Sequence, residues 1–249
     1  MKGKTLIACV ITLLLVSISY ADLVIEVRAI GTSNPGQITI SGDQKLVTLA
    51  SGATGTITLG LYATMTGYSD NGTGTDEIMV NNAGSIKAGA APRSPLGNLG
   101  SPDLDNAWDA AGSGNGAVAD LNADTYMDIG SNVQSDTSAT WIWTRADTAP
   151  VGQMIAIGGT LIHTSVYTIS SAVPGGTDGV INFVPRANTN ALQYASNASW
   201  RENNVVKTGN PALLTYKGGT NVVLHVVPEP STLILLCMGV LALFAIRRK

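Results

Sequence analysis

Cysteine is nearly absent from this chain of 249 residues. Its two cysteines, Cys9 and Cys237, each lie inside an apolar run close to one end of the chain. The long region between these runs therefore offers neither a disulfide nor a thiol nucleophile.

Residues typical of catalysis are also scarce. The only histidines, His163 and His225, stand in alternating strand patterns, so we expect neither to act as a catalytic base or zinc ligand. The chain lacks a Gly-x-Ser-x-Gly elbow, a His-Glu-x-x-His motif and a phosphate-binding glycine loop. Glu26, Glu77 and Glu202 could supply a glycosidase pair, but nothing in the sequence places them together, and surface charge is their ordinary role. A non-enzymatic protein is expected, with a glycoside hydrolase as the less favoured alternative.

Positive charge is sparse between the two terminal runs. Residues 22–226 contain nine Lys and Arg residues against sixteen Asp and Glu residues. Nucleic-acid binding needs a positive face that displaces counterions, so no nucleic acid is expected as a partner. The acidic composition, rich in Gly, Asn, Ser and Thr, is typical of an extracellular β-protein that stays soluble through its charge.

Residues 1–21 have the layout of a secretory signal peptide. Lys2 and Lys4 precede an apolar run over residues 6–16, and Ser19 and Ala21 are small residues at the two positions that signal peptidase reads. We expect a signal helix that is cut after Ala21. An uncleaved first membrane helix is the alternative, although the apolar run is short for a membrane span.

Strand patterns fill most of residues 22–226. The expected strands are rich in β-branched residues, are bounded by Gly, Pro or Asn, and cover residues 22–30, 37–40, 45–50, 55–66, 139–145, 153–157, 160–170, 179–185, 191–195, 204–207 and 220–227. Only residues 101–111, around Trp108, read as a short helix, and residues 70–136 are the least regular part. The pattern predicts an all-β fold, a single large β-sandwich of jelly-roll type.

Two of these strands carry a looser resemblance. Residues 56–63 alternate Thr with aliphatic residues, and residues 179–185 form a late apolar strand. In this the chain resembles the sandwiches of the cohesin and carbohydrate-binding-module group. The resemblance implies a domain that binds a protein or a glycan, although a fold alone does not establish a function.

The irregular region contains an acidic stretch with the spacing of a calcium loop. Oxygen ligands stand at positions 1, 3, 5, 7 and 9, supplied by Asp120, Asn122, Asp124, the carbonyl of Tyr126, and Asp128. The spacing resembles that of dockerins and EF-hands. It departs from them at Thr125, where the sharp turn needs Gly, and at Ser131, where a bidentate acid should close the shell. We expect no cofactor and favour an ordinary Asp- and Asn-rich surface loop, and weak Ca²⁺ binding is the alternative.

Trp141 and Trp143 are two residues apart on an expected strand, so they share one face of it. Exposed, the pair would form a stacking platform for sugar rings, as in a carbohydrate-binding module. Buried, the two rings would be part of the sandwich core, which is the favoured interpretation.

The last 23 residues have three parts in a fixed order. The first is the polar motif Val227, Pro228, Glu229, Pro230 and Ser231, followed by an apolar run over residues 232–246 and a basic end of Arg247, Arg248 and Lys249. The run is about 22 Å long as a helix, which is short for a hydrocarbon core about 30 Å thick. Its basic end would hold a transmembrane helix with the C-terminus in the cytoplasm.

This tail resembles a PEP-CTERM sorting signal. The resemblance implies an exosortase as partner, a membrane-embedded cysteine transpeptidase that cuts near the motif. It implies that the protein is a membrane-anchored precursor that passes to the cell envelope or extracellular matrix of a Gram-negative bacterium producing exopolysaccharide. A structural or adhesive role beside an exopolysaccharide or protein matrix partner is expected. The alternative is a plain C-terminal anchor that is not cut.

Overall fold

The computed structural model describes most of the region between the two terminal runs. The described residues are 22–66, 78–89, 95–133, 140–148, 153–156, 158–169, 175–186, 198–202, 205–209, 222–228 and 238. All strands of this region lie in two sheets, so the all-β prediction is confirmed for the described residues.

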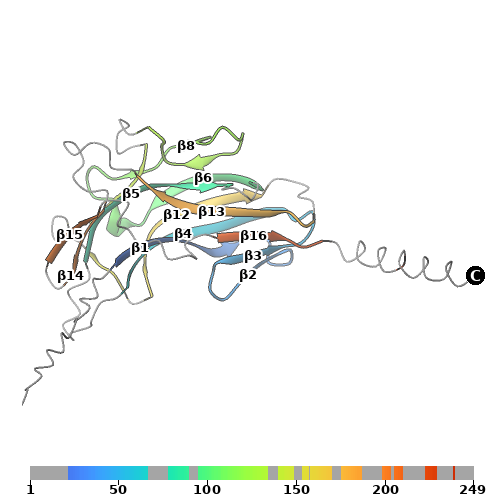
Figure 1. Cartoon of the computed structure of the whole chain (residues 1–249), viewed down its shortest axis with the longest axis horizontal. Coiled ribbons are helices and arrows are strands. Elements are labelled where there is room, and N and C mark those ends of the chain that lie inside the picture. Colours follow the sequence, from blue (N-terminus) through green and yellow to red (C-terminus); the bar gives the residue numbers. More distant parts are fainter. Residues whose placement is uncertain are drawn as a thin grey trace, which may run out of the picture.

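The smaller sheet has four antiparallel strands (Figure 1). They lie in the order β1 (Asp22–Thr32), β4 (Gly55–Thr66), β12 (Thr160–Ile169) and β6 (Gly97–Leu104). In β1 the residues Leu23, Ile25 and Val27 are fully buried, while Glu26 and Arg28, which alternate with them, lie on the other face. This alternation is the period-2 pattern that the sequence shows.

The larger sheet has twelve strands. Its main path runs through β15 (Val205–Gly209), β14 (Ala198–Glu202), β5 (Ile78–Ala88), β13 (Asp178–Pro185), β16 (Val222–Val226), β3 (Leu46–Leu49) and β2 (Ile38–Ile40). The short strands β7 (Gly114–Asn115), β8 (Val118–Ala119), β9 (Asp128–Ile129), β10 (Ile142–Arg145) and β11 (Gln153–Met154) lie off this path, around β5. The pair β16–β3 is parallel.

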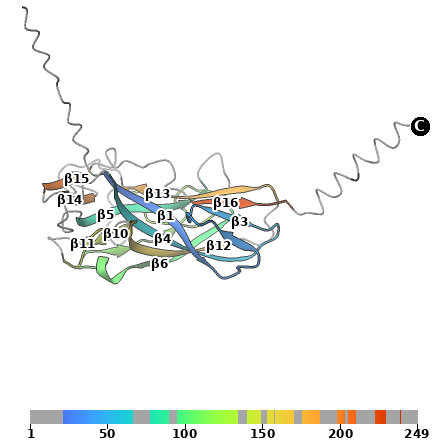
Figure 2. The ribbon, with the colours of Figure 1, turned by 90° about the horizontal axis from the view of Figure 1, so that it is seen from below.

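The two sheets pack face to face around one hydrophobic core. The smaller sheet contributes Leu23, Ile25, Ile57, Leu59 and Leu61, and the larger sheet contributes Val47, Leu49, Ile86, Ile181, Leu224 and Val226, all with no exposed surface. Figure 2 shows the two sheets one above the other. The architecture is a β-sandwich.

Residues 70–136 were expected to be the least regular part of the chain. That prediction is wrong, because the long strands β5 and β6 lie within this range. The centre of β5 is built from small and polar residues because neighbours pack closely on it. A Cβ at Gly84 would collide with the ring of Phe183, and a Cβ at Gly130 would collide with Ser85. Such a strand has no hydrophobic alternation that would identify it.

The expected short helix over residues 101–111 is only partly present. Residues up to Leu104 belong to β6, and a 3₁₀ turn, η1 (Asn106–Trp108), follows it. The side chain of Asp105 caps this turn by accepting the amide of Ala107 at 3.1 Å. Strand β14 was not expected at all, whereas the expected strand over residues 191–195 lies outside the described residues.

Candidate functional site

The last strand, β16, lies inside the larger sheet rather than at its edge. It pairs antiparallel with β13 and parallel with β3. Val222, Leu224 and Val226 are fully buried, while Val223 and His225 lie on the half-buried face. The C-terminal segment of the described domain is therefore held on both sides by backbone hydrogen bonds and from one face by the core.

Backbone hydrogen bonds continue to the first residue of the sorting motif. The carbonyl of Val226 accepts the amide of Gly176 at 2.7 Å, and the amide of Val226 donates to Thr177 at 3.0 Å. The amide of Val227 donates to the carbonyl of Leu49 at 2.8 Å. Val227 thus follows β16 directly and is still tied to Leu49 at the end of β3.

Pro228 is the second residue after the end of β16. It is exposed, and it lies against Gly175, where a Cβ would come within 2.7 Å of the Pro228 Cα atom. Glu229, Pro230, Ser231 and the basic residues Arg247, Arg248 and Lys249 lie outside the described residues, as does Ala21 at the expected signal cleavage site.

Strand β16 leaves the sandwich at the end opposite the β14–β15 hairpin, and β1 begins near that hairpin (Figures 1 and 2). No helix among the described residues is long and apolar enough to cross a membrane. In the tail beyond Pro228, only Met238 is described, in a helical conformation.

The acidic loop places its carboxylates on backbone amides. Asp120 accepts the amides of Asp124 at 3.1 Å and of Thr125 at 2.9 Å, and Asp124 accepts the amides of Tyr126 at 2.9 Å and, through its other oxygen, the side-chain amide of Asn122 at 2.8 Å. No group of three or more His, Cys, Asp or Glu side chains in the described part is arranged to hold a metal ion. Ca²⁺ binding stays a prediction.

Thr125 stands where a calcium loop carries glycine, and its φ is +76°. A β-branched residue rarely adopts this left-handed conformation. The chain therefore makes the turn that the spacing indicates, but with a residue that is strained there.

Asp128, the last residue of that spacing, faces inward. Its side chain accepts the amides of Ala88 at 2.9 Å and Leu121 at 3.1 Å and is almost fully buried. Burial raises the pKa of this carboxyl above its ordinary value, and the two backbone hydrogen bonds act against that rise. Asp128 thus fastens the loop to β5.

An open hollow of about 340 Å³ lies beside this loop. It is lined by Ala117, Ala119, Asp120, Leu121, Gly130, Ser131, Asn132, Val133 and Thr140. Asn132 donates to the carbonyl of Leu121 and accepts from Lys87 at 2.6 Å. The side chain of Asn132 thus links Leu121, in the wall of the hollow, to Lys87 of β5.

Trp108, Trp141 and Trp143, the tryptophans whose side chains the structure describes, do not form an exposed platform. Trp108 and Trp141 are buried, and Trp143 is half-buried. The guanidinium of buried Arg186 lies 4.7 Å from the centre of the Trp141 ring and 5.6 Å from that of Trp143. One guanidinium thus makes cation–π contacts with both rings. The burial removes the main support for a carbohydrate-binding module built on these residues.

The two histidines have different surroundings. His163 is fully buried in β12, with Nε2 3.0 Å from the carbonyl oxygen of Asn115. Burial lowers its pKa to about 4, against a smaller opposing effect of that hydrogen bond. His225, on β16, is partly exposed, with Nδ1 2.6 Å from a carboxylate oxygen of Asp178.

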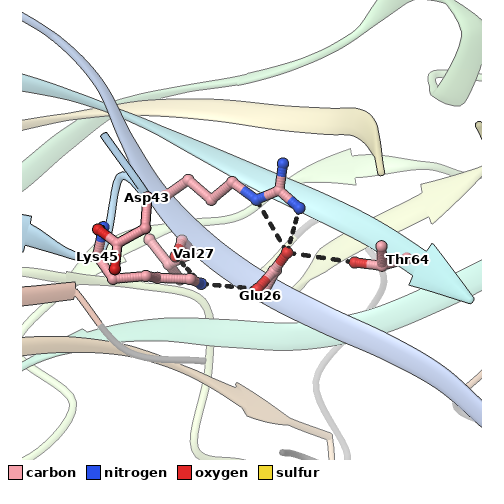
Figure 3. A network of polar contacts seen from close by, with 6 residues as sticks. Glu26, Val27, Asp43, Lys45 and Thr64 are labelled. Carbon is pink, nitrogen blue, oxygen red and sulfur yellow. Dashed lines mark hydrogen bonds and ion pairs between the residues drawn. The ribbon is translucent and has the colours of Figure 1, made fainter. Parts of the chain in front are cut away.

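A charged network that the sequence analysis did not single out lies at the edge of β1 (Figure 3). Glu26 accepts Arg28 Nε at 2.9 Å, Lys45 Nζ at 2.8 Å and Thr64 Oγ1 at 3.3 Å, and the guanidinium of Arg28 stacks 4.4 Å from the Tyr62 ring centre. In the sequence, only the two-residue spacing of Glu26 and Arg28, which puts them on one face of the strand, pointed to this network. The partner Lys45 is far along the chain.

This network changes the titration of its members. Burial of Glu26 acts to raise its pKa, but hydrogen bonds from Lys45 and Arg28 outweigh burial, and the pKa lies below its ordinary value. Burial also lowers the pKa of Lys45, with Glu26 acting against that effect. The carboxylate of Glu26 is therefore engaged in structural ion pairs and is not available as a free catalytic acid.

Comparison with known proteins identifies the C-terminal tail. Residues 226–249 match the PEP-CTERM protein-sorting motif, so the predicted sorting signal is confirmed. The match begins at the last residue of β16. A comparison with curated proteins gives no match.

Among solved structures, the chain is similar to a type III cohesin module from the cellulosomal ScaE cell-surface anchoring scaffoldin of Ruminococcus flavefaciens. The sequence identity is 9%, the TM-score is 0.36, and the similarity covers 86% of this chain and 92% of that chain. At this score the likeness supports no inference about the strand arrangement or the partner of this chain.

Proposed function

We propose that this chain is an exported protein, sorted by an exosortase, whose β-sandwich has a structural or adhesive and non-enzymatic role in the cell envelope or extracellular matrix. The observation that carries the proposal is the sorting motif over residues 226–249. In this proposal signal peptidase removes residues 1–21, and the apolar run over residues 232–246 holds the precursor in the inner membrane until the exosortase cuts it.

The placement of the motif supports this route. Strand β16 ends at one end of the sandwich, and the exposed Pro228 follows within two residues. A processing enzyme in the membrane can therefore approach the motif without entering the sandwich. The rest of the domain extends from that end toward the β14–β15 hairpin (Figure 1).

Two of the side chains that could have served catalysis, Glu26 and His163, support a non-enzymatic role. Glu26 is held in ion pairs with Arg28 and Lys45, and His163 is buried. Glu77 lies outside the described residues, and the side chain of Glu202 is not described. We propose further that the sandwich is of the jelly-roll or cohesin type and that its partner in the matrix is an exopolysaccharide or a protein.

The experiment compares the chain in its native host with and without the exosortase. With the enzyme, we expect an intact mass that runs from Asp22 to near the motif, recovered from the envelope or medium. Without it, the chain should keep Lys249 and stay in the membrane. Replacing both Pro228 and Pro230 by alanine should have the same effect as loss of the enzyme, and Pro35→Ala, in a loop of the sandwich, is the matched control. Unchanged size and location without the exosortase would contradict the proposal.

A further inference from the structure

We infer that Lys87 and Asn132 become joined by an intramolecular isopeptide bond, a covalent amide between their two side chains. The inference does not depend on the proposed sorting route, because it concerns chemistry within the sandwich. Residues 22–226 contain no cysteine, so a covalent bond between the strands of this domain has to come from other side chains.

The first observation is where the fold places the two residues. Lys87 belongs to β5, and Asn132 follows β9, the short strand that pairs antiparallel with β5 through Ile86↔Ile129. One step further along the same register, Asp128 lies opposite Lys87. Residues that are far apart in the sequence are thus held side by side by the sheet.

The second observation is the contact between the two side chains. Lys87 Nζ donates to Oδ1 of Asn132 at 2.6 Å. A C=O bond is about 1.2 Å long, so Nζ is at most about 3.8 Å from Cγ, the carbon that the amine would attack. Reacting atoms in a near-attack arrangement are about 3–3.5 Å apart, so little movement is needed. Nδ2 of Asn132 donates to the carbonyl of Leu121, which fixes the orientation of the amide.

The third observation is a buried carboxyl group beside this pair. Asp128 is almost fully buried opposite Lys87. Burial raises the pKa of Asp128, while its two backbone hydrogen bonds and the nearby charge of Lys87 act against that rise. A carboxylate whose pKa is raised accepts a proton more readily than an ordinary surface carboxylate. Asp128 is therefore placed to take the proton that the ammonium of Lys87 must lose before it can attack.

The reaction is a transamidation. Asp128 first takes one proton from Lys87, and the neutral amine attacks Cγ of Asn132 to form a new C–N bond. A second proton moves from Nζ to Nδ2 in the tetrahedral adduct. The Cγ–Nδ2 bond then breaks, its electron pair leaves with the nitrogen as ammonia, and ammonia takes back the proton that Asp128 holds. Neither an oxidant nor a cofactor is consumed.

The reaction has to occur only once in each molecule. Lysine amines are mostly protonated at neutral pH, which slows the attack. Fixed proximity acts in the opposite direction, since well-oriented groups within one molecule react as though present at about 10⁵ M or more. Asn132 is exposed, so the ammonia escapes into the solvent and the bond accumulates.

The test is the mass of the full chain, purified in detergent and incubated at about pH 9, where more of the lysine amine is neutral. We expect a chain that is lighter than its sequence by one ammonia. Trypsin does not cut after an acylated lysine, so residues 46–93 should stay joined and be linked to residues 94–145 in one branched peptide. A full mass after incubation, with residues 46–87 and 94–145 as separate peptides, would overturn the inference.

Three variants test the assignment of the two ends. Lys87→Arg keeps the positive charge but removes the amine, and Asn132→Ala removes the amide, so each should keep the full mass. Asn182→Ala is the matched control, because Asn182 pairs with Lys87 on the other side of β5, and this variant should still lose ammonia. If Asn132→Ala formed the branched peptide and Asn182→Ala did not, the inference would be overturned.

Ammonia is also lost when an Asn-Gly sequence forms a succinimide, for which Asn115 and Gly116 provide an example. A succinimide gives no branched peptide and is opened by hydroxylamine, whereas an isopeptide bond resists hydroxylamine. Ammonia loss that hydroxylamine reverses, without a branched peptide, would overturn the inference.

The role of Asp128 is tested by the rate of bond formation. Asp128→Asn should slow the loss of ammonia more at about pH 7 than at about pH 9, because a high pH frees the lysine amine without help from a carboxylate. Circular dichroism verifies that the variant is folded. Equal slowing at both pH values would overturn the role of Asp128 as proton acceptor, since a purely structural effect would not depend on pH in this way.

Discussion

The ammonium nitrogen of Lys45 lies 2.8 Å from a carboxylate oxygen of Glu26, and this ion pair joins the two sheets of the sandwich. Glu26 belongs to β1 in the smaller sheet, and Lys45 directly precedes β3 in the larger one. The same ammonium donates to the carbonyl of Val27 at 2.8 Å, and the backbone carbonyl of Lys45 accepts the amide of Val223 at 2.8 Å. Lys45 therefore contacts both β1 and β16, and Figure 3 shows its contacts with Glu26 and Val27 on the β1 side.

The first prediction concerns acid stability. The pKa of Glu26 lies below its ordinary value of 4.5, so its ion pairs stabilise the fold above that pH and lose this effect as the pH falls through the folded-state pKa. Glu26→Gln should lower the free energy of unfolding at pH 7 by about 1–2 kcal/mol and flatten its decline below pH 4.5. Urea unfolding at a series of pH values measures both effects.

The control for Glu26→Gln is Asp147→Asn, which makes the same change of charge at an exposed position. It should leave the free energy of unfolding at pH 7 near that of the wild type. If both variants lost the same stability, net charge and not the ion pairs of Glu26 would be the cause.

The second prediction concerns His163. Its folded-state pKa of about 4 lies below its ordinary value of 6.5, so the unfolded chain takes up a proton first as the pH falls. Stability should therefore be lost between about pH 6.5 and pH 4, by up to roughly 3 kcal/mol. In His163→Gln this part of the pH dependence should disappear, as followed by thermal or urea unfolding.

The matched control removes the other histidine. His225→Gln acts at a position whose side chain is 45% exposed. If His225→Gln abolished the same pH dependence and His163→Gln did not, the assignment to the buried histidine would be wrong.

Local patterns in the sequence predicted the strands that have one face in the core. β1, β4, β12, β13 and β16 all combine alternation with β-branched residues, and each was expected with bounds close to those observed. β5 was not predicted, because the residues at its centre, from Asn81 to Ser85, are small or polar. These residues are small because other strands pack closely on them. Those strands lie far away in the sequence, so a local pattern does not reveal them.

The candidate site divides along the same line. The sorting motif is a contiguous stretch of sequence, so it could be recognised directly. The ion pair of Glu26 and Lys45 instead depends on how β1 packs against the turn between β2 and β3. The acidic loop is intermediate. Its spacing indicated a curled chain, but whether Asp120 faces a metal or the amide of Thr125 depends on three-dimensional detail.

The third prediction tests the close packing at β5. A Cβ at Gly84 would meet the end of the Phe183 ring and the carbonyl of Val184, so Gly84→Ala should destabilise the fold by about 2 kcal/mol. Phe183→Leu removes the ring atoms and should recover part of this loss in the double variant, a non-additivity that a double-mutant cycle measures. Gly42→Ala, where the added Cβ meets nothing within 4 Å, is the control. Purely additive losses would show that Phe183 is not what limits residue size at Gly84.

The last prediction links the core to the site of sorting. Leu224 is fully buried at the centre of β16, and Leu224→Ala should cost about 2–5 kcal/mol, since it shortens a core side chain and leaves a cavity. Because the packing of this side chain holds β16 against the core, proteinase K should now cut before Pro228 at doses that leave the wild-type strand intact. Val223→Ala, on the half-buried face of the same strand, should keep the wild-type core. If Leu224→Ala lowered the free energy of unfolding but left the end of the resistant core unchanged, the strand would be protected by its backbone pairing alone, and the core would have no part in setting where the chain can be cut.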